Sequence, residues 1–377
     1  MAFNIEHAGA LILSYATQKI YDARAKIIKP QTPKKIAIIS DPAIGDFIVT
    51  MPAMESIKKN YPKSRILLIA PKDLIPLAPK KMETMPLPKT NIEKIETVLK
   101  IIKFKPQLIV NFYEPDYPSI ILSLLLLPTC QKRVDLSSSL REDKLIKKNW
   151  KPTHFNEYAS QTLQKEGIKA PITKPKIKSS KTDIKNAKQI LKKAGVKKNF
   201  AILFPTSKTR KTWPVENFAS LIDQIHEKTK LEIIIPTSPE NEKTIQEITQ
   251  QTENKPIILP KTNLETLAAI ASLAKIYVGM DTGITHIAAA TGCPAVSIFT
   301  SGKIYNFYPY TERGAAIYIK KYANLTITTQ RKDIEKLQSI EDFDQITPEC
   351  VMKAILKVLA KKKDNKQQKI PFNGIEC

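Results

Sequence analysis

The chain has 377 residues, 42% of them hydrophobic and 25% charged, and this composition excludes a chain disordered throughout or a collagen-like repeat. Its length corresponds to two or three domains. No apolar run reaches the ~18 residues of a membrane-spanning helix, and residues 1–20 lack the basic start of a secretory signal. We therefore expect a cytoplasmic protein.

The net charge of +24 is unevenly distributed along the chain. Residues 1–200 hold 37 Lys or Arg against 17 Asp or Glu, residues 201–350 hold 16 against 17, and residues 351–377 hold 7 against 2. This asymmetry indicates that the front half meets an anionic partner, such as a phosphorylated lipid, a membrane surface or nucleic acid. The alternative is a lysine-rich composition that only decorates solvated faces, and it explains the asymmetry less well.

The front half alternates between strand and helix patterns. Buried strands are predicted at 36–40, 66–69 and 107–112, and amphipathic helices at 47–60 and 91–103. This order predicts an α/β domain with a parallel sheet over residues 34–165. Residues 1–33 form an N-terminal extension. They are compatible with an amphipathic helix, whose usual fate is to pack on the domain rather than to lie on a membrane.

A second α/β series follows residues 166–182, which lose periodicity and predict an interdomain linker. It covers residues 183–346, with strands expected at 200–204, 231–235, 256–259, 275–279 and 295–299 and helices near 214–228, 240–251, 263–273 and 284–291. Such a series predicts a doubly wound sheet. A last amphipathic helix is expected at 347–360, and a basic, disordered tail at 361–377.

Ligands of doubly wound folds bind beyond the carboxyl ends of the strands. The loop after strand 36–40 carries Gly45 and Asp46. Asp46 either caps the following helix or acts as a base, and residue type alone favours the cap. The loop after strand 200–204 carries Thr206, Ser207 and Lys211 before a helix, which suits a diphosphate better than a merely solvated basic loop.

Two further loops carry candidate donor-site residues. After strand 275–279 comes Met280-Asp281-Thr282-Gly283-Ile284-Thr285-His286, in which Thr282 and the helix start suit phosphate and Asp281 can accept from sugar hydroxyls. A lone histidine on a helix is usually an ordinary residue, but His286 is directed back towards the same loop. Glu240, after strand 231–235, either binds a ribose diol or simply begins a helix.

Several classes of function are disfavoured by missing motifs. The chain contains no P-loop, no GxSxG elbow and no GxGxxG fingerprint. None of its four histidines has a second His or Cys at metal-ligand spacing, so no metal site is expected. Its lysine runs are not interleaved with aromatic residues, so nucleic acid is not an expected partner.

Taken in order, these loops resemble the heptosyltransferases of lipopolysaccharide core synthesis, glycosyltransferase family nine. The resemblance is carried by GDFIVTMPAMESIKKNYP, LFPTSKTRKTWPVENFASLI and DTGITHIAAATGCPAVSIF, of which the last is the most specific. The chain departs from the family pattern at Asp41, Thr206, Met280 and Thr300. These departures bear on the donor sugar and the acceptor rather than on the fold.

The resemblance implies two Rossmann-like doubly wound domains facing across a cleft, the GT-B type. It implies a metal-independent, inverting transfer from ADP-heptose to an anionic, lipid-linked glycan acceptor, with no cofactor and with peripheral contact at the cytoplasmic face of the inner membrane. The C-terminal half would bind the ADP-sugar donor and the basic N-terminal half the acceptor. A same-fold enzyme with another nucleotide-sugar donor or glycan acceptor is the alternative, and a catalytically silent sugar-binding homologue is a more distant one.

The resemblance also assigns roles to the candidate residues. Asp46 would be the general base, with Gly45 beside it on the acceptor side. Lys211 would be the second catalytic residue and would hold the diphosphate with Thr206, Ser207 and Thr282. Glu240 would bind the ribose, Asp281 and His286 would face the donor sugar, and Gly283 would also belong to the donor site. These roles suit inverting transfer, in which the attacking oxygen loses a proton and the leaving diphosphate gains charge.

Overall fold

The computed structural model describes most of the chain. Described residues are 16–17, 19–23, 31–112, 130–136, 153–206, 212–238, 241–299, 304–319, 345–361 and 370–376. The predicted site residues Ser207, Lys211 and Glu240 lie outside them.

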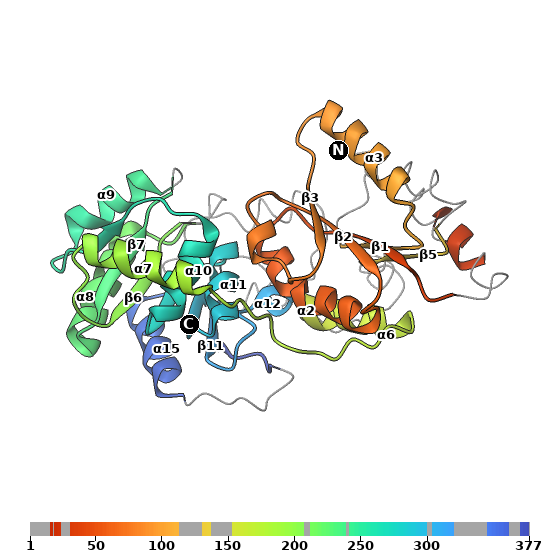
Figure 1. The fold of residues 1–377 in the computed structure, drawn as a ribbon. Helices are drawn as coiled ribbons and strands as arrows, with labels where there is room; N and C mark the ends of the chain where they lie inside the picture. Colours follow the sequence, from red (N-terminus) through yellow and green to blue (C-terminus); the bar gives the residue numbers. More distant parts are fainter. Residues whose placement is uncertain are drawn as a thin grey trace, which may run out of the picture. The chain divides into compact units, whose positions relative to one another are not determined.

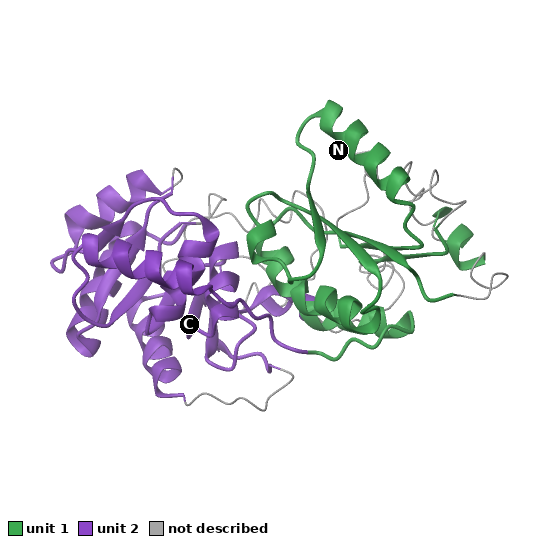
Figure 2. Ribbon diagram, in the orientation of Figure 1, with its two compact units in different colours: residues 1–152, 156–172 green, residues 153–155, 173–377 purple. Residues whose placement is uncertain are grey.

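Two compact units make up the fold (Figure 2). Unit 1 contains residues 1–152 and 156–172, and unit 2 contains residues 153–155 and 173–377. The last change of unit, between residues 172 and 173, therefore falls inside the predicted linker at 166–182. The assignment of residues 153–155 to unit 2 differs from the expected single boundary, because these three residues pack on elements far along the chain.

Unit 1 is built on a five-stranded parallel sheet with the strand order β3-β2-β1-β4-β5 (Figure 1). The strands are β1 (Lys35–Ile39), β2 (Arg65–Ala70), β3 (Glu83–Pro86), β4 (Leu108–Asn111) and β5 (Lys132–Asp135). The helices are α2 (Ile44–Asn60), the short 3₁₀ helix η1 (Ile75–Leu77), α3 (Asn91–Phe104) and α6 (Phe155–Lys165). The three predicted strands and two predicted helices are confirmed, and β1 lies at the centre of the sheet.

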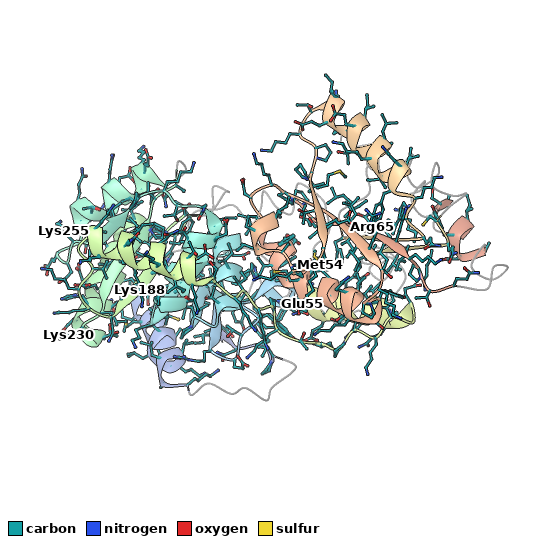
Figure 3. All side chains as sticks on the ribbon, in the orientation of Figure 1. Met54, Glu55, Arg65, Lys188, Lys230 and Lys255 are labelled. Atoms are coloured by element: carbon teal, nitrogen blue, oxygen red, sulfur yellow. The ribbon has the colours of Figure 1, made fainter. Side chains whose placement is uncertain are left out.

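The two outer strands of this sheet were not predicted, because neither is an apolar run. β3 reads ETMP, and its Glu83 forms an ion pair of 2.8 Å with Arg65 at the start of β2 (labelled in Figure 3). β5 reads KRVD, and its Arg133 and Asp135 form a 2.5 Å ion pair with both side chains 1% exposed. Burying two charges is tolerated here because they neutralise each other.

Unit 2 contains a seven-stranded parallel sheet with the order β12-β11-β10-β9-β6-β7-β8. Its strands are β6 (Phe200–Phe204), β7 (Glu232–Pro236), β8 (Ile257–Leu259), β9 (Ile276–Met280), β10 (Ala295–Ile298), β11 (Gly314–Tyr318) and β12 (Gly374–Glu376). Its helices are α7 (Lys181–Lys193), α8 (Val215–Thr229), α9 (Glu242–Gln251), α10 (Leu264–Leu273), α11 (Gly283–Thr291), α12 (Ile304–Phe307) and α15 (Pro348–Ala360). The five predicted strands and four crossover helices are confirmed, and β11 and β12 extend the sheet.

Helices cover both faces of this sheet, and alternate side chains of β6 pack on one face and then the other. Ala201 and Leu203 belong to one apolar cluster, with residues of α8, α9 and α15. Phe200, Ile202 and Phe204 belong to the other, with residues of α7, α10 and α11. Because side chains alternate between the faces of a strand, the continuous apolar run FAILF fits a doubly wound sheet.

Both ends of the chain contribute to the folded units. Tyr21, in the N-terminal extension, is 1% exposed and packs in the same cluster as Ile69, Ile101 and Phe104 of unit 1. At the other end, β12 pairs in parallel with β11, and Ile370 is 2% exposed. The prediction of a disordered tail at 361–377 is therefore wrong for residues 370–376, where a three-residue edge strand is too short to leave a recognisable pattern.

None of the described helices has the length and apolar character needed to cross a membrane.

Candidate active site

The switch point of the unit 2 sheet lies between β6 and β9. These strands are parallel neighbours, with Phe204 opposite Gly279. The helices that follow them, α8 and α11, pack on opposite faces of the sheet. The loops that begin at Pro205 and Asp281 therefore leave the same sheet edge side by side, at the place where open α/β sheets bind their ligands.

Gly279 allows the ends of β6 and β9 to approach closely. A Cβ atom on Gly279 would lie 2.7 Å from the Phe204 carbonyl oxygen and 2.7 Å from the Tyr277 hydroxyl. Tyr277 is fully buried, and its burial raises the pKa of its hydroxyl, which lies at hydrogen-bond distance, 3.3 Å, from Thr285 Oγ1. The same Thr285 oxygen donates to the Met280 carbonyl at 2.9 Å, so the first turn of α11 is fastened to the end of β9.

The N-terminus of α11 is suited to bind an anion. Its N-cap residue, Thr282, is in an extended conformation and makes no side-chain capping hydrogen bond. Thr282 Oγ1 is buried near the Tyr277 hydroxyl and makes no hydrogen bond of normal geometry among the described residues. An uncapped helix start offers free N–H groups and the positive end of the helix dipole, and a buried hydroxyl without a normal hydrogen bond is costly unless something binds it. Together, these features suit the start of α11 to binding an oxyanion.

His286 lies in the first turn of α11, and its side chain is buried. Burial lowers the pKa of its imidazole from 6.5 to about 4. The ring stands edge-on to Phe307, with the ring centroids 6.4 Å apart. His286 is therefore neutral at physiological pH, so it can exchange hydrogen bonds with a sugar but contributes no positive charge to a diphosphate site.

His154 is a second buried histidine of unit 2, and the sequence analysis did not single it out. Its Nε2 lies 3.0 Å from the Tyr308 carbonyl oxygen, and its ring packs against those of Tyr308 and Tyr310, with centroids 4.6 and 4.4 Å away. Burial, and then the proximity of His286, lower its pKa to about 3. His154 is far in sequence from all four candidate loops, so the sequence alone could not show that it lies near His286.

These two histidines should make the fold sensitive to mild acid. Their pKa values are below the ordinary 6.5, so the unfolded chain binds protons that the folded chain does not, and stability falls as the pH drops below 6.5. For each of the two histidines, the free energy of unfolding should fall by roughly 2 kcal/mol when the pH is lowered from 7 to 5. Denaturant titrations at several pH values between 7 and 5 should show this decrease in the free energy of unfolding. The decrease should be smaller in His286→Gln. His226→Gln, on α8, is the matched control and should show the same decrease as the wild type. If the stability of His286→Gln falls with pH as steeply as that of the wild type, His286 does not cause the acid sensitivity.

The loop after β6 is anchored at both ends. Thr206 is 7% exposed at the sheet edge. After the loop, Trp213 is 1% exposed, donates from its indole Nε1 to the Ile346 carbonyl at 2.8 Å and stands edge-on to Phe218. Pro214 is then the N-cap residue of α8. The segment that carries Ser207 and Lys211 therefore starts at the sheet edge beside Thr206 and ends at the buried Trp213.

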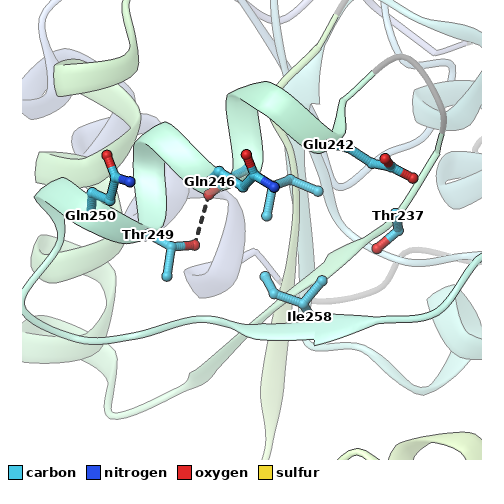
Figure 4. Close-up of a pocket in the computed structure, with 7 residues that line it drawn as sticks. Thr237, Glu242, Gln246, Thr249, Gln250 and Ile258 are labelled. Atoms are coloured by element: carbon cyan, nitrogen blue, oxygen red, sulfur yellow. Dashed lines mark hydrogen bonds between the residues drawn. The ribbon is translucent and has the colours of Figure 1, made fainter.

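The turn after β7 is held by a buried asparagine next to the predicted ribose ligand Glu240. Asn241 is fully buried, accepts from the Ser238 amide at 2.7 Å and donates to the Pro236 carbonyl at 3.0 Å. An open pocket of about 450 Å³ begins at this turn, between α9 and β8 (Figure 4). Its lining residues are Thr237, Glu242, Ile245, Gln246, Thr249, Gln250 and Ile258.

In unit 1, Gly45 and Asp46 are the second and third residues of α2, directly after the central strand β1. The N-cap residue of α2 is Ala43, and no side chain caps the helix. The carboxylate that orders this turn belongs to Asp41, whose Oδ1 accepts from the Ala43 amide at 2.7 Å. The interpretation of Asp46 as the N-cap is therefore wrong, and its half-buried side chain lies in the first turn of the helix.

Two polar residues that were not among the predicted site residues end β4 and β5, the two strands on one side of β1. Asn111 is the last residue of β4, opposite Ile39, and Asp135 is the last residue of β5, opposite Asn111. Both are buried. Since β1, β4 and β5 are parallel neighbours, these side chains come from the same sheet edge as the Asp46 turn. Of the two, only Asn111 could have been found from the sequence, because it lies near the end of a strand that was predicted.

The part of the chain that the structure describes contains no group of three His, Cys, Asp or Glu side chains placed to hold a metal ion.

Comparison with known proteins gives a consistent result. The model of glycosyltransferase family 9 (heptosyltransferase) matches residues 131–337, more than half of the chain. Lipopolysaccharide heptosyltransferase 3 of Escherichia coli is 24% identical over 321 residues, which cover 78% of this chain and 92% of that protein.

Solved structures share the fold. A family 9 glycosyltransferase from Veillonella parvula superimposes with a TM-score of 0.72 at 20% identity, covering 89% of this chain and 99% of that one. The E. coli ADP-heptose lipopolysaccharide heptosyltransferase II does so with a TM-score of 0.66 at 17% identity, covering 86% and 98%. The family model that matches more than half of the chain shows that the chain belongs to glycosyltransferase family 9, the heptosyltransferases, and is a glycosyltransferase.

Proposed function

We propose that this enzyme transfers a heptose from ADP-heptose to an anionic lipopolysaccharide core acceptor, with inversion at the anomeric carbon and without a metal or cofactor. The observation that carries the proposal is that the ends of β6 and β9 are neighbours at the switch point, next to the uncapped start of α11 and the buried Thr282 Oγ1. That arrangement supports a diphosphate site on unit 2.

On the donor side, the N–H groups at the start of α11, Thr282 and Thr206 would surround the diphosphate, with Ser207 and Lys211 supplied by the loop after β6. Glu240 would bind the ribose, next to the pocket that begins at Thr237. Asp281, Gly283 and the neutral His286 would face the heptose. The cation of Lys211 and the N–H groups would stabilise the charge that develops on the leaving ADP.

On the acceptor side, Asp46 would take the proton of the attacking hydroxyl. The acceptor oxygen forms a bond to C1 of the heptose while the bond from C1 to the diphosphate oxygen breaks. The proton ends on the Asp46 carboxylate and the electron pair of the broken bond on ADP. Asp46 lies in the first turn of α2, the helix that follows the carboxyl end of the central strand β1, and this position supports the role. The two units would face each other across a cleft, as in GT-B enzymes.

The donor assignment is tested by thermal shift with ADP-, UDP-, GDP- and CMP-sugars. We expect stabilisation by ADP compounds alone, because a ligand that binds only the folded state raises its melting temperature. Thr282→Val keeps the shape of the side chain but removes the hydroxyl, and it should weaken the response to ADP. Stabilisation by UDP- or GDP-sugars alone would contradict the ADP-heptose assignment and support another nucleotide-sugar donor.

The enzyme would reach its lipid-linked acceptor as a peripheral protein at the cytoplasmic face of the inner membrane. The excess of 20 basic residues in positions 1–200, from 37 against 17, supports attraction to anionic lipids.

A further inference from the structure

The most exposed large apolar side chains among the described residues belong to one helix of unit 1. On α3, Ile92 is 72% exposed, Ile95 63% and Leu99 60%. Their spacing of three and four residues places them on one face of the helix, within about 60° of each other at 100° per residue. We call these three residues the α3 stripe.

α3 is anchored to unit 1 mainly by its C-terminal end. Ile101 and Phe104 are buried in the cluster that contains Ala37 of β1 and Ile69 of β2. At its other end, Thr90 caps the helix in a capping box with Glu93. The first turns of α3, which carry the stripe, lie at the outer side of unit 1 (Figure 1). The helix is thus well formed at both ends while one of its apolar faces is open to solvent.

The charge around the α3 stripe is positive. Residues 80–105 hold seven lysines and three glutamates. Each glutamate is already engaged: Glu83 by Arg65, Glu93 by the amides of Lys89 and Thr90, and Glu96 by Lys100 at 3.7 Å. The helical wheel places Lys103 beside one edge of the stripe, followed by Glu96 and Lys100, which pair with each other, so the net charge along that edge is positive. Apolar residues bordered by lysines are typical of helices that lie in the interface of an anionic membrane.

We propose that the α3 stripe is the surface by which unit 1 docks on an anionic lipid bilayer, with Ile92, Ile95 and Leu99 entering the lipid and the neighbouring lysines meeting the headgroups. This docking proposal rests on the proposed function, because an enzyme with a lipid-linked acceptor has to work at a membrane. A second copy of the chain fits the stripe less well, because three side chains cover far less than the roughly 800 Å² per partner of a stable dimer.

Vesicle sedimentation tests the docking surface without donor or acceptor. The wild-type protein should bind vesicles of phosphatidylethanolamine and phosphatidylglycerol at low salt and be released by high salt. Ile95→Gln with Leu99→Gln removes apolar area but no charge, and should weaken binding at least tenfold. The matched control is Leu356→Gln, because Leu356 is a 44% exposed leucine on α15 of unit 2. This variant should bind vesicles like the wild type. Lys103→Gln should weaken binding about fivefold.

A second measurement follows the stripe itself. In Leu99→Trp the tryptophan emission should shift to the blue on adding the same vesicles, whereas Leu356→Trp should show no shift. Unchanged vesicle binding by Ile95→Gln with Leu99→Gln would overturn the proposal. So would a light-scattering result in which the wild type is a dimer and that variant a monomer. The thermal response to ADP is measured on the same variant, so that loss of donor binding, which concerns the proposed function, is separated from loss of docking.

Discussion

Asp46→Asn should abolish most of the transfer while leaving the fold and donor binding intact. Asparagine keeps the size of the side chain but cannot take a proton, and general-base catalysis typically contributes ~10²–10⁴-fold, so kcat should fall by about that factor. Asp46 is the third residue of α2 and not its cap, so the cost to the fold is only a favourable charge–dipole interaction of about 0.3–1 kcal/mol.

The matched control is Asp41→Asn, five residues earlier in the same turn. Its side-chain oxygen can still accept from the Ala43 amide, so this variant should keep both its fold and its kcat. Melting temperature, donor Kd and kcat are measured side by side, together with the pH–rate profile, whose acid limb should disappear in Asp46→Asn. If Asp46→Asn keeps a large fraction of wild-type kcat, the base is another residue of unit 1.

Lys211→Ala should reduce kcat/KM by about 10–150-fold, the equivalent of the 1.5–3 kcal/mol that a charge-assisted hydrogen bond contributes. Lys211 lies in the chain between Thr206 and Trp213, the two buried residues that fix the ends of the loop after β6. Because its charge would stabilise a leaving group that becomes more anionic during the reaction, kcat should fall together with donor affinity.

Lys208→Ala is the control for a general loss of positive charge from the same loop, since it removes an equal charge three residues away. We expect it to have a much smaller effect. Steady-state kinetics and ADP titrations of both variants make the comparison. Equal losses in the two variants would show that the loop acts only through its overall charge, and wild-type kinetics in Lys211→Ala would remove it from the site.

The strands that line the candidate site were predictable from sequence because each is a short run of buried apolar residues. β6 (FAILF) and β9 (IYVGM) are examples, and their adjacency at the switch point gives the loops after them a common location. The same reasoning could not find β5, because its buried Arg133 and Asp135 read as a polar loop until their ion pair is seen.

The role of single polar residues was less predictable than the strands. Residue type favoured Asp46 as a helix cap, but the helix starts at Ile44 and Asp41 orders the turn, a difference of a few residues that propensities do not resolve. His154 packs on Tyr308 and Tyr310, more than 150 residues away, so only the tertiary fold reveals its proximity to His286.

The most direct test of the proposed function is the transfer reaction itself. The purified enzyme is incubated with ADP-heptose and a panel of lipopolysaccharide core acceptors that each lack one heptose, and the products are analysed by mass spectrometry and by NMR of the new anomeric centre. We expect one acceptor to gain a single heptose, with the anomeric configuration opposite to that of the donor and with release of ADP. Transfer only from a UDP- or GDP-sugar, or a product that retains the donor configuration, would contradict the account.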